Sequence, residues 1–184
     1  MLVFSGFLVR AECGLSFWSE LGFLIFLKGQ VYNAELETQN SAPKTRFSAP
    51  IAIHPGSGSP RKNWPVERWA ELGERLCSQA PLLIVGGEAD TTAVAALAAL
   101  GEVAQSLPLP ELTRRLAACR WFLGHDSGVS HLAAAVGTPC VLLFGPTDPA
   151  MWAPPGGHVQ IVRRGPELSA IPVDAVWAAV TSQR

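Results

Sequence analysis

From Pro50 onward, short and continuously apolar runs alternate with segments of helical periodicity. The apolar runs predict strands at 51–54, 81–87, 103–107, 121–125, 140–145 and 158–162. The periodic segments predict helices at 64–79, 89–101, 110–120, 130–137 and 172–183. Strands that are apolar along their whole length and alternate with helices indicate a parallel sheet covered on both faces. The pattern therefore predicts an α/β fold with a doubly wound, Rossmann-like parallel sheet.

Residues 1–49 follow a different pattern and are predicted to form an N-terminal extension and linker, whereas 50–184 form the domain. The stretch 30–49 is polar and interrupted by Pro43, as linkers are. Upstream, the run from Leu21 to Leu27 is apolar, but no stretch reaches the 18 residues needed to span a bilayer. Two interpretations of this run stay open, a buried or partner-facing element and a peripheral contact with a membrane.

Composition narrows the function classes. The 184-residue chain has a formal net charge of −1, so no basic patch indicates a nucleic-acid partner. Four cysteines, at positions 13, 77, 119 and 140, form no CxxC pair. This usage predicts buried thiols in a reducing compartment.

Ligands of such sheets bind in the loops that follow the carboxyl ends of the strands. The first of these loops, 54–65, contains Gly56 and Gly58, which allow close approach to the backbone, and the hydroxyl of Ser57. Lys62 adds positive charge, and a helix N-terminus follows. Phosphate binding is the functional interpretation; a Gly/Ser-rich surface turn is the alternative. The loop matches neither the dinucleotide fingerprint nor a P-loop.

The loop after the second predicted strand carries Glu88 behind two glycines. A carboxylate at this place can accept hydrogen bonds from ribose hydroxyls. An acidic residue that stabilises a helix dipole is an equally good explanation.

A third loop joins the strand 121–125 to the next helix. Its backbone amides and the helix N-terminus predict a second anion site, formed by Ser127, Gly128, Val129, Ser130 and His131. Asp126 precedes this turn; its carboxylate suits sugar hydroxyls or a neighbouring cation such as Lys62. Helix capping by Ser127 or Ser130 is the structural alternative.

Together, two anion-binding helix starts flanked by acids predict a site for a nucleotide-diphosphate sugar. Other chemistries fit less well. The serine hydrolase motif G-x-S-x-G is absent from the turn, where serine stands one place too late. The histidines and cysteines near it have no usual metal-ligand spacing. A nicotinamide-dependent oxidoreductase fits the sheet but not the loops.

The stretches "IAIHPGSGSPRKNWPVERWAEL", "LLIVGGEAD" and "FLGHDSGVSHLAAAVGTPCVLLFGPTDPAMWAP" resemble the C-terminal half of glycosyltransferase family 9, the ADP-heptose:lipopolysaccharide heptosyltransferases. The resemblance covers about Ile51 to Pro154. It implies that this half is the nucleotide-sugar domain of a two-domain GT-B enzyme. It also implies inverting transfer of heptose from ADP-heptose to lipopolysaccharide core, without a metal or other cofactor.

The resemblance also implies roles for individual residues. Lys62 matches the lysine at the donor diphosphate, Glu88 the acid near the ribose, and Asp126 the aspartate near the donor sugar. Lys62 and Asp126 are accordingly the catalytic candidates. The remaining binding candidates by resemblance are Gly56, Ser57, Gly58, Ser127, Gly128, Val129, Ser130 and His131.

The sequence departs from the family in residues 1–49, where no motif of the acceptor-binding domain and no general base can be identified. We therefore expect a chain that supplies only the donor-binding half, and that depends on a missing N-terminal domain or a split partner chain for the acceptor. The alternative is a non-catalytic, truncated remnant that binds nucleotide or a partner protein. A cytoplasmic location is expected, with peripheral contact at the inner membrane as a further expectation.

Overall fold

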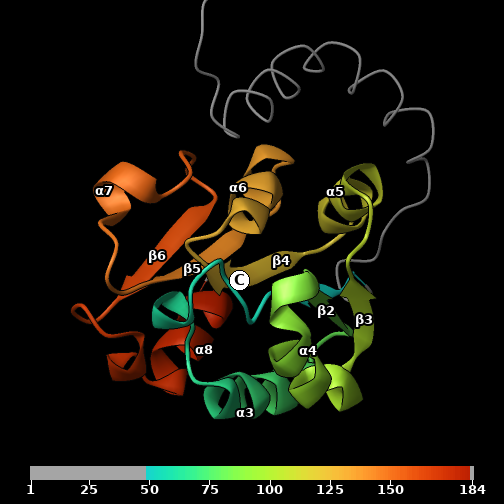
Figure 1. Cartoon of the computed structure of the whole chain (residues 1–184), viewed down its shortest axis with the longest axis horizontal. Helices are drawn as coiled ribbons and strands as arrows, with labels where there is room; N and C mark the ends of the chain where they lie inside the picture. The colour runs from blue at the N-terminus through green and yellow to red at the C-terminus, as the bar shows by residue number, and fades with distance from the viewer. Residues whose placement is uncertain (1–48, 183–184) are drawn as a thin grey trace, which may run out of the picture. The chain divides into compact units, whose positions relative to one another are not determined.

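The computed structural model describes residues 49–182 (Figure 1). These residues form one six-stranded sheet in the order β3-β2-β1-β4-β5-β6, in which every neighbouring pair is parallel. The strands are β1 (Ile51–Ile53), β2 (Leu82–Gly86), β3 (Glu102–Gln105), β4 (Trp121–His125), β5 (Cys140–Phe144) and β6 (Val159–Arg163). The predicted doubly wound, Rossmann-like parallel sheet is confirmed.

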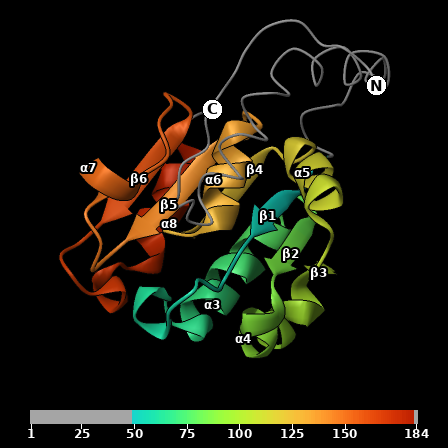
Figure 2. The same cartoon turned by 45° about the horizontal axis from the view of Figure 1, so that its top comes forward.

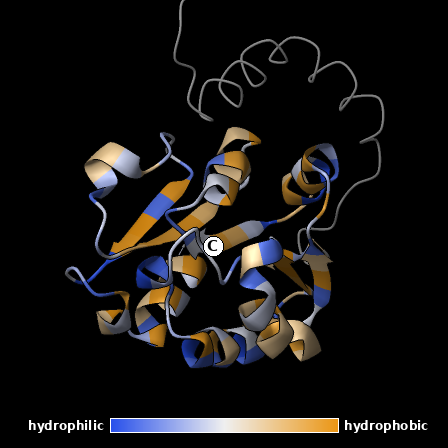
Figure 3. Cartoon of the chain, viewed as in Figure 1, coloured by the Kyte–Doolittle hydropathy of each residue, from blue (hydrophilic) through white to orange (hydrophobic). Residues whose placement is uncertain are grey.

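Helices cover both faces of this sheet. On one face lie α3 (Val66–Cys77), α4 (Thr91–Leu97) and α8 (Val173–Thr181), and on the other lie α5 (Leu109–Ala117) and α6 (Gly128–Ala135) (Figure 1). Two separate clusters of buried apolar side chains correspond to the two faces. Colouring by hydropathy shows the strands largely apolar and the polar residues mostly on helices and loops (Figure 3).

Continuous burial explains why the central strands read as uninterrupted apolar runs. Every residue of β1, β2, β4 and β5 is buried, because side chains that point to either face meet helices. The edge strands differ: β3 buries only Ala104, and β6 is half-buried over most of its length. Figure 2 shows β3 and β6 at the two edges of the sheet.

Helix α3 illustrates how the periodic pattern becomes packing. Its buried residues include Trp69, Leu72 and Leu76, which recur at spacings of three and four and so lie on one face. The helix begins at Val66, directly after Pro65. Proline suits this position because its missing N–H has no partner in the first turn of a helix.

The sequence analysis did not predict several short elements. These are the helix α7 (Pro149–Trp152) and the 3-10 turns η1 (Pro60–Lys62) and η4 (Leu168–Ala170); the single helix predicted at 89–101 is α4 flanked by two further 3-10 turns, η2 (Glu88–Asp90) and η3 (Ala98–Leu100). Each has only three or four residues, too few to show an apolar period. In α7, Met151 and Trp152 are exposed.

The prediction of buried cysteines is right for two positions and wrong for a third. Cys119 and Cys140 are buried, and burial raises the pKa of the Cys140 thiol to about 12. Cys77, the last residue of α3, is exposed, and its Sγ lies 3.2 Å from the carbonyl oxygen of Leu100. The fourth cysteine, at position 13, and the apolar run at 21–27 lie outside the described residues, as does nearly all of the predicted extension 1–49.

The chain order places a switch point between β1 and β4. From β1 the chain first builds outward through β2 and β3, then crosses back to start β4 on the other side of β1. Ile53 of β1 pairs with Leu123 of β4, so the loops that follow these two strands leave the sheet side by side. Ligands of open parallel sheets bind at such a point.

Candidate functional site

The loops after β1 and β4 are joined by a contact between Lys62 and Asp126. Lys62 Nζ lies 3.2 Å from Asp126 Oδ2 and donates to the Asp126 backbone carbonyl at 3.1 Å. The Lys62 side chain is 27% exposed, and the Asp126 side chain is 10% exposed. The structure thus brings together the two residues that the sequence analysis gave as catalytic candidates.

The turn that carries Lys62 is held by its own side chains. Ser57 is buried, and its Oγ lies 2.6 Å from Asn63 Oδ1 and 2.9 Å from the carbonyl oxygen of Ser59. Its hydroxyl therefore closes the 57–63 turn from inside. Gly58, in contrast, is exposed, and a Cβ added there would meet nothing within 4 Å.

Gly56 is required for a different reason from the one that the sequence indicates. A Cβ at this position would lie 1.7 Å from Asp90 Oδ1, so the absence of a side chain makes room for the Asp90 carboxylate. Gly56 is buried, and its backbone approaches a neighbouring protein loop. Asp90 is a residue that the sequence analysis missed.

His125, at the end of β4, was also missed as a site residue. Its Nε2 accepts a hydrogen bond from the backbone N–H of Trp64 at 2.8 Å, so Nδ1 carries the hydrogen and faces the carbonyl of Gly56 at 3.2 Å. The ring is fully buried and packs edge-on against Trp69, with centroids 5.3 Å apart. Burial lowers the pKa of His125 to about 3, so the imidazole is neutral.

The consequence of these bonds is positional. His125 links the start and the end of the turn that carries Lys62 to the strand that carries Asp126. A histidine immediately after an apolar strand run was visible in the sequence, but its two partners are 61 and 69 positions away.

At the start of α6, the predicted anion-binding turn divides into exposed and buried parts. Ser127 is the N-cap, and its Oγ accepts from the Ser130 N–H at 3.4 Å, which makes the capping interpretation correct for Ser127. Ser130 is buried, and its hydroxyl donates to the His125 carbonyl. Gly128 is exposed at the first helical position, while Val129 and His131 are half-buried.

The loop after β2 places an exposed acid at the carboxyl ends of the strands, where the other two loops also lie. Glu88 begins η2 directly after β2 and is exposed. Two residues on, Asp90 turns inward, and its Oδ2 accepts from the Gly87 N–H at 2.9 Å and faces His54 Nε2 at 3.2 Å. The hydrogen bond from His54 holds the pKa of Asp90 below its usual range.

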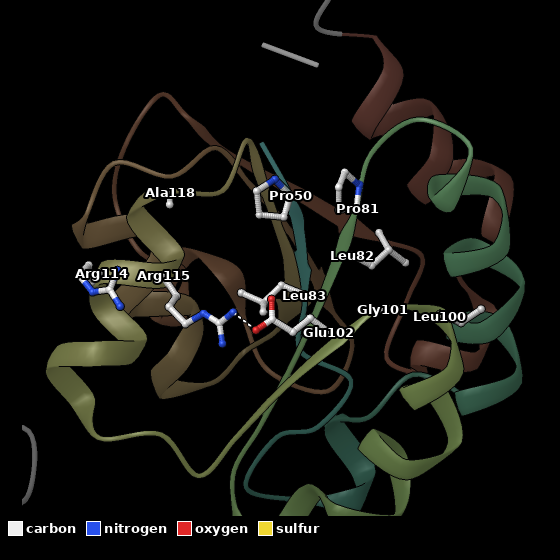
Figure 4. Close-up of a pocket in the computed structure, with 10 residues that line it drawn as sticks. All are labelled: Pro50, Pro81, Leu82, Leu83, Leu100, Gly101, Glu102, Arg114, Arg115 and Ala118. Carbon is white, nitrogen blue, oxygen red and sulfur yellow. Dashed lines mark hydrogen bonds and ion pairs between the residues drawn. The ribbon is translucent and has the colours of Figure 1, made fainter. Parts of the chain in front are cut away.

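A groove of about 420 Å³ lies at the other end of the strands, away from the candidate site (Figure 4). Pro50, Pro81 and Gly101, which line it, precede β1, β2 and β3, so the groove is at the amino ends of the strands. Arg115 points toward Glu102 there and forms an ion pair with it. Ligand sites of parallel sheets form at the carboxyl ends, so this groove is separate from the candidate site.

Within residues 49–182, no group of three or more histidine, cysteine, aspartate or glutamate side chains could hold a metal ion. None of the helices described there has the length and apolar character needed to cross a bilayer.

The strand order, the switch point and the loops beside it are those of the Rossmann-like domains that bind nucleotides. A family model described as glycosyltransferase family 9 (heptosyltransferase) matches residues 27–172, well beyond the range that carries the resemblance in sequence. The chain therefore belongs to glycosyltransferase family 9.

Individual relatives agree with this assignment. Lipopolysaccharide heptosyltransferase 1 of Pseudomonas aeruginosa is 40% identical over 93 residues, which are 48% of this chain and 26% of that protein. Lipopolysaccharide heptosyltransferase 2 of Escherichia coli is 31% identical over 124 residues, 61% of this chain and 36% of that protein. The matched part of the chain thus spans about a third or less of these curated relatives.

Among solved structures, the E. coli heptosyltransferase WaaC with ADP superimposes with a TM-score of 0.70 and 27% sequence identity. The superposition covers 82% of this chain and 48% of WaaC. The fold described here therefore corresponds to about half of that enzyme.

Proposed function

We propose that this chain binds ADP-heptose at the carboxyl edge of its sheet and supplies the donor half of a heptosyltransferase acting on lipopolysaccharide core. The observation that carries the proposal is the contact between Lys62 and Asp126, which joins the loops after β1 and β4 beside the start of α6. The relative WaaC, with ADP in its solved structure, supports the choice of nucleotide.

Each loop has a part in the proposed complex. The N-terminus of α6, with the exposed Gly128 and the capping Ser127, and the ammonium of Lys62 provide positive potential for the diphosphate. Glu88 accepts hydrogen bonds from the ribose hydroxyls. Asp126, which already neutralises part of the Lys62 charge, accepts from hydroxyls of the donor sugar.

The chemistry that these groups would perform is stabilisation of the leaving group. In an inverting transfer, the acceptor oxygen attacks the anomeric carbon, the bond from that carbon to the diphosphate breaks, and ADP leaves with the electron pair. Lys62 and the α6 N-terminus lower the barrier by interacting with the negative charge that develops on the diphosphate. The acceptor proton must pass to a base, which we place in an acceptor-binding domain outside residues 49–182.

Donor binding is tested by calorimetry on the full chain with ADP and ADP-heptose, with UDP and GDP as specificity controls. We expect ADP and ADP-heptose to bind more tightly than UDP and GDP. A folded sample that binds neither adenine ligand rules the proposal out.

Transfer is tested separately, with lipopolysaccharide core as the acceptor. We propose that the reaction occurs at the cytoplasmic face of the inner membrane and needs an acceptor domain, from the same protein or from a partner chain. Donor binding without transfer, even after an acceptor domain is added, would favour a nucleotide-binding remnant.

A further inference from the structure

Three side chains from three different loops form a hydrogen-bonded series beneath the start of α6. Asp90 Oδ2 lies 3.2 Å from His54 Nε2, and His54 Nδ1 lies 3.3 Å from Ser127 Oγ. The side chains of His54 and Asp90 are 4% and 9% exposed. The series therefore reaches from a nearly buried carboxylate to the hydroxyl that caps α6.

The charge of Asp90 determines which nitrogen of His54 carries a hydrogen. Its carboxylate accepts from the Gly87 N–H and from His54, and the bond with His54 lowers its pKa, so Asp90 is ionised. An ionised carboxylate can only accept, so His54 Nε2 must carry a hydrogen. The other ring nitrogen, Nδ1, then faces Ser127 in either of two forms.

The two forms give the Ser127 hydroxyl opposite directions. When His54 is neutral, Nδ1 is an acceptor and the Ser127 O–H donates to it. When His54 is protonated, Nδ1–H donates to Ser127 Oγ, and the hydroxyl hydrogen is released toward another acceptor; within the protein, Ser130 Oγ lies 3.0 Å from Ser127 Oγ and is one such acceptor. A phosphate oxygen at the N-terminus of α6 is such an acceptor, and the added positive charge also favours it.

We propose that Asp90 and His54 are positioning residues for Ser127, and that a diphosphate binding at the start of α6 is accompanied by uptake of a proton at His54. The inference rests on the proposed donor site and adds a proton linkage to it. Asp90 is the counter-ion that lowers the free-energy cost of protonating the buried imidazole, because a paired buried charge costs far less than an isolated one.

Other charged or titratable groups lie on the loops around His54. Lys62 is paired with Asp126, and His125 is neutral because its burial depresses its pKa. Asp90 is the carboxylate in direct contact with the imidazole. The charged and titratable residues on the surrounding elements are Arg61 and Lys62 from η1, Glu88 and Asp90 from η2, His125 from β4, Asp126 from the turn after it, and His131 from α6.

The test is calorimetry of ADP binding to the full chain in two buffers of different ionisation enthalpy, which gives the number of protons taken up. Wild type should take up protons on binding, so its dissociation constant should rise as the pH is raised. Asp90→Asn should abolish the uptake at His54 and weaken ADP on the order of tenfold. The titration of ADP itself is common to all variants and cancels in the difference.

Asp148→Asn is the charge-matched control. It removes a carboxylate from the N-cap of α7, in the loop that follows β5, where Asp148 Oδ1 accepts from the Ala150 N–H at 3.1 Å. We expect its ADP affinity and proton uptake to equal those of wild type. An equal loss in both variants would show a general charge effect and overturn the inference.

Ser127→Ala provides a second arm if Asp90→Asn does not fold. Without the hydroxyl, His54 loses the acceptor for its Nδ1–H, so proton uptake should fall and ADP should bind on the order of tenfold more weakly. Where both variants fold, their effects on affinity should be non-additive in the double variant, because both act on one series of bonds.

The outcomes separate the inference from the proposed function. If wild type binds ADP with the same proton uptake as Ser127→Ala and Asp90→Asn, the proton linkage is wrong and the donor site stands. If wild type does not bind ADP, the donor site itself is wrong and the linkage falls with it.

Discussion

Lys62 Nζ and Asp126 Oδ2 lie 3.2 Å apart although 64 positions separate the two residues in the chain. The pair forms because β1 and β4 are neighbours in the sheet, so that the loops after them meet. Most of the Lys62 side chain is covered, and 27% of it is exposed. The site thus depends on the strand order and not on proximity in sequence.

Lys62→Ala should weaken ADP binding by on the order of 1–3 kcal/mol, because a charge-assisted contact with the diphosphate is lost. Arg61→Ala is the matched control, since Arg61 is an exposed cation on the same 3-10 turn. Calorimetry should show a near wild-type dissociation constant for this control. Equal affinities in the two variants would remove the assigned role of Lys62.

Glu88→Ala should reduce ADP affinity by about 1 kcal/mol and leave pyrophosphate affinity unchanged. The reason is that Glu88 is assigned to the ribose, which pyrophosphate lacks. Titration of both ligands into wild type and variant checks this. An equal loss of pyrophosphate affinity would mean that Glu88 affects the loop conformation or the electrostatic potential of the site and does not contact the ribose hydroxyls.

Gly56→Ala should destabilise the fold by roughly 1–3 kcal/mol, because the new methyl group overlaps the Asp90 carboxylate. Gly58→Ala is the control: a Cβ there meets nothing within 4 Å, so its free energy of unfolding should stay close to wild type. Urea denaturation of the two variants gives the comparison. Similar midpoints would contradict the close packing of Asp90 against Gly56.

Acid should destabilise the folded protein through His125. The pKa of His125 is lowered to about 3 in the folded state, and an unfolded histidine titrates near 6.5. Between these values the unfolded state binds more protons, so the free energy of unfolding falls as the pH falls, by about 1.4 kcal/mol per pH unit. This loss begins below about pH 6.5.

His125→Asn isolates that contribution. Asparagine cannot be protonated in this range, and its amide can still donate toward the Gly56 carbonyl in place of Nδ1–H. The variant should be less stable at neutral pH, yet its stability should depend less steeply on pH between about 6 and about 4.5. Parallel pH profiles for variant and wild type would exclude His125 as the source.

The sequence predicted the regular elements well and the short ones poorly. Strands that are buried on both faces, such as β4 and β5, give unbroken apolar runs, and α3 gives a clear period. The four residues of α7 are too few to show either signal. The start of α6 was predicted two residues late, because Gly128 and Val129 do not look helical in isolation.

In the candidate site, the sequence identified exposed groups such as Glu88 and buried ones such as Ser57 and Ser130, but it missed the histidines and the aspartate that connect the loops. Lys62, Glu88 and the turn after Asp126 follow from strand-end position and residue type. His54, Asp90 and His125 matter through partners on other loops, at distances of 36 to 73 positions, so no local pattern reveals them. The local sequence offers one weak indication of such connecting residues, namely a histidine or an acidic residue near a glycine at the end of a strand.

The central place of β1 has a consequence for how the molecule folds. β1 is the first strand of the described chain, yet one of its two neighbours starts only at Trp121, whose pairing with Ile51 closes a long loop. Closing such loops is slow, because the chain entropy is lost before the contacts are gained. Nucleotide affinity should therefore be acquired late during refolding, which would make a fluorescent ADP analogue a kinetic reporter of the last strand alignment.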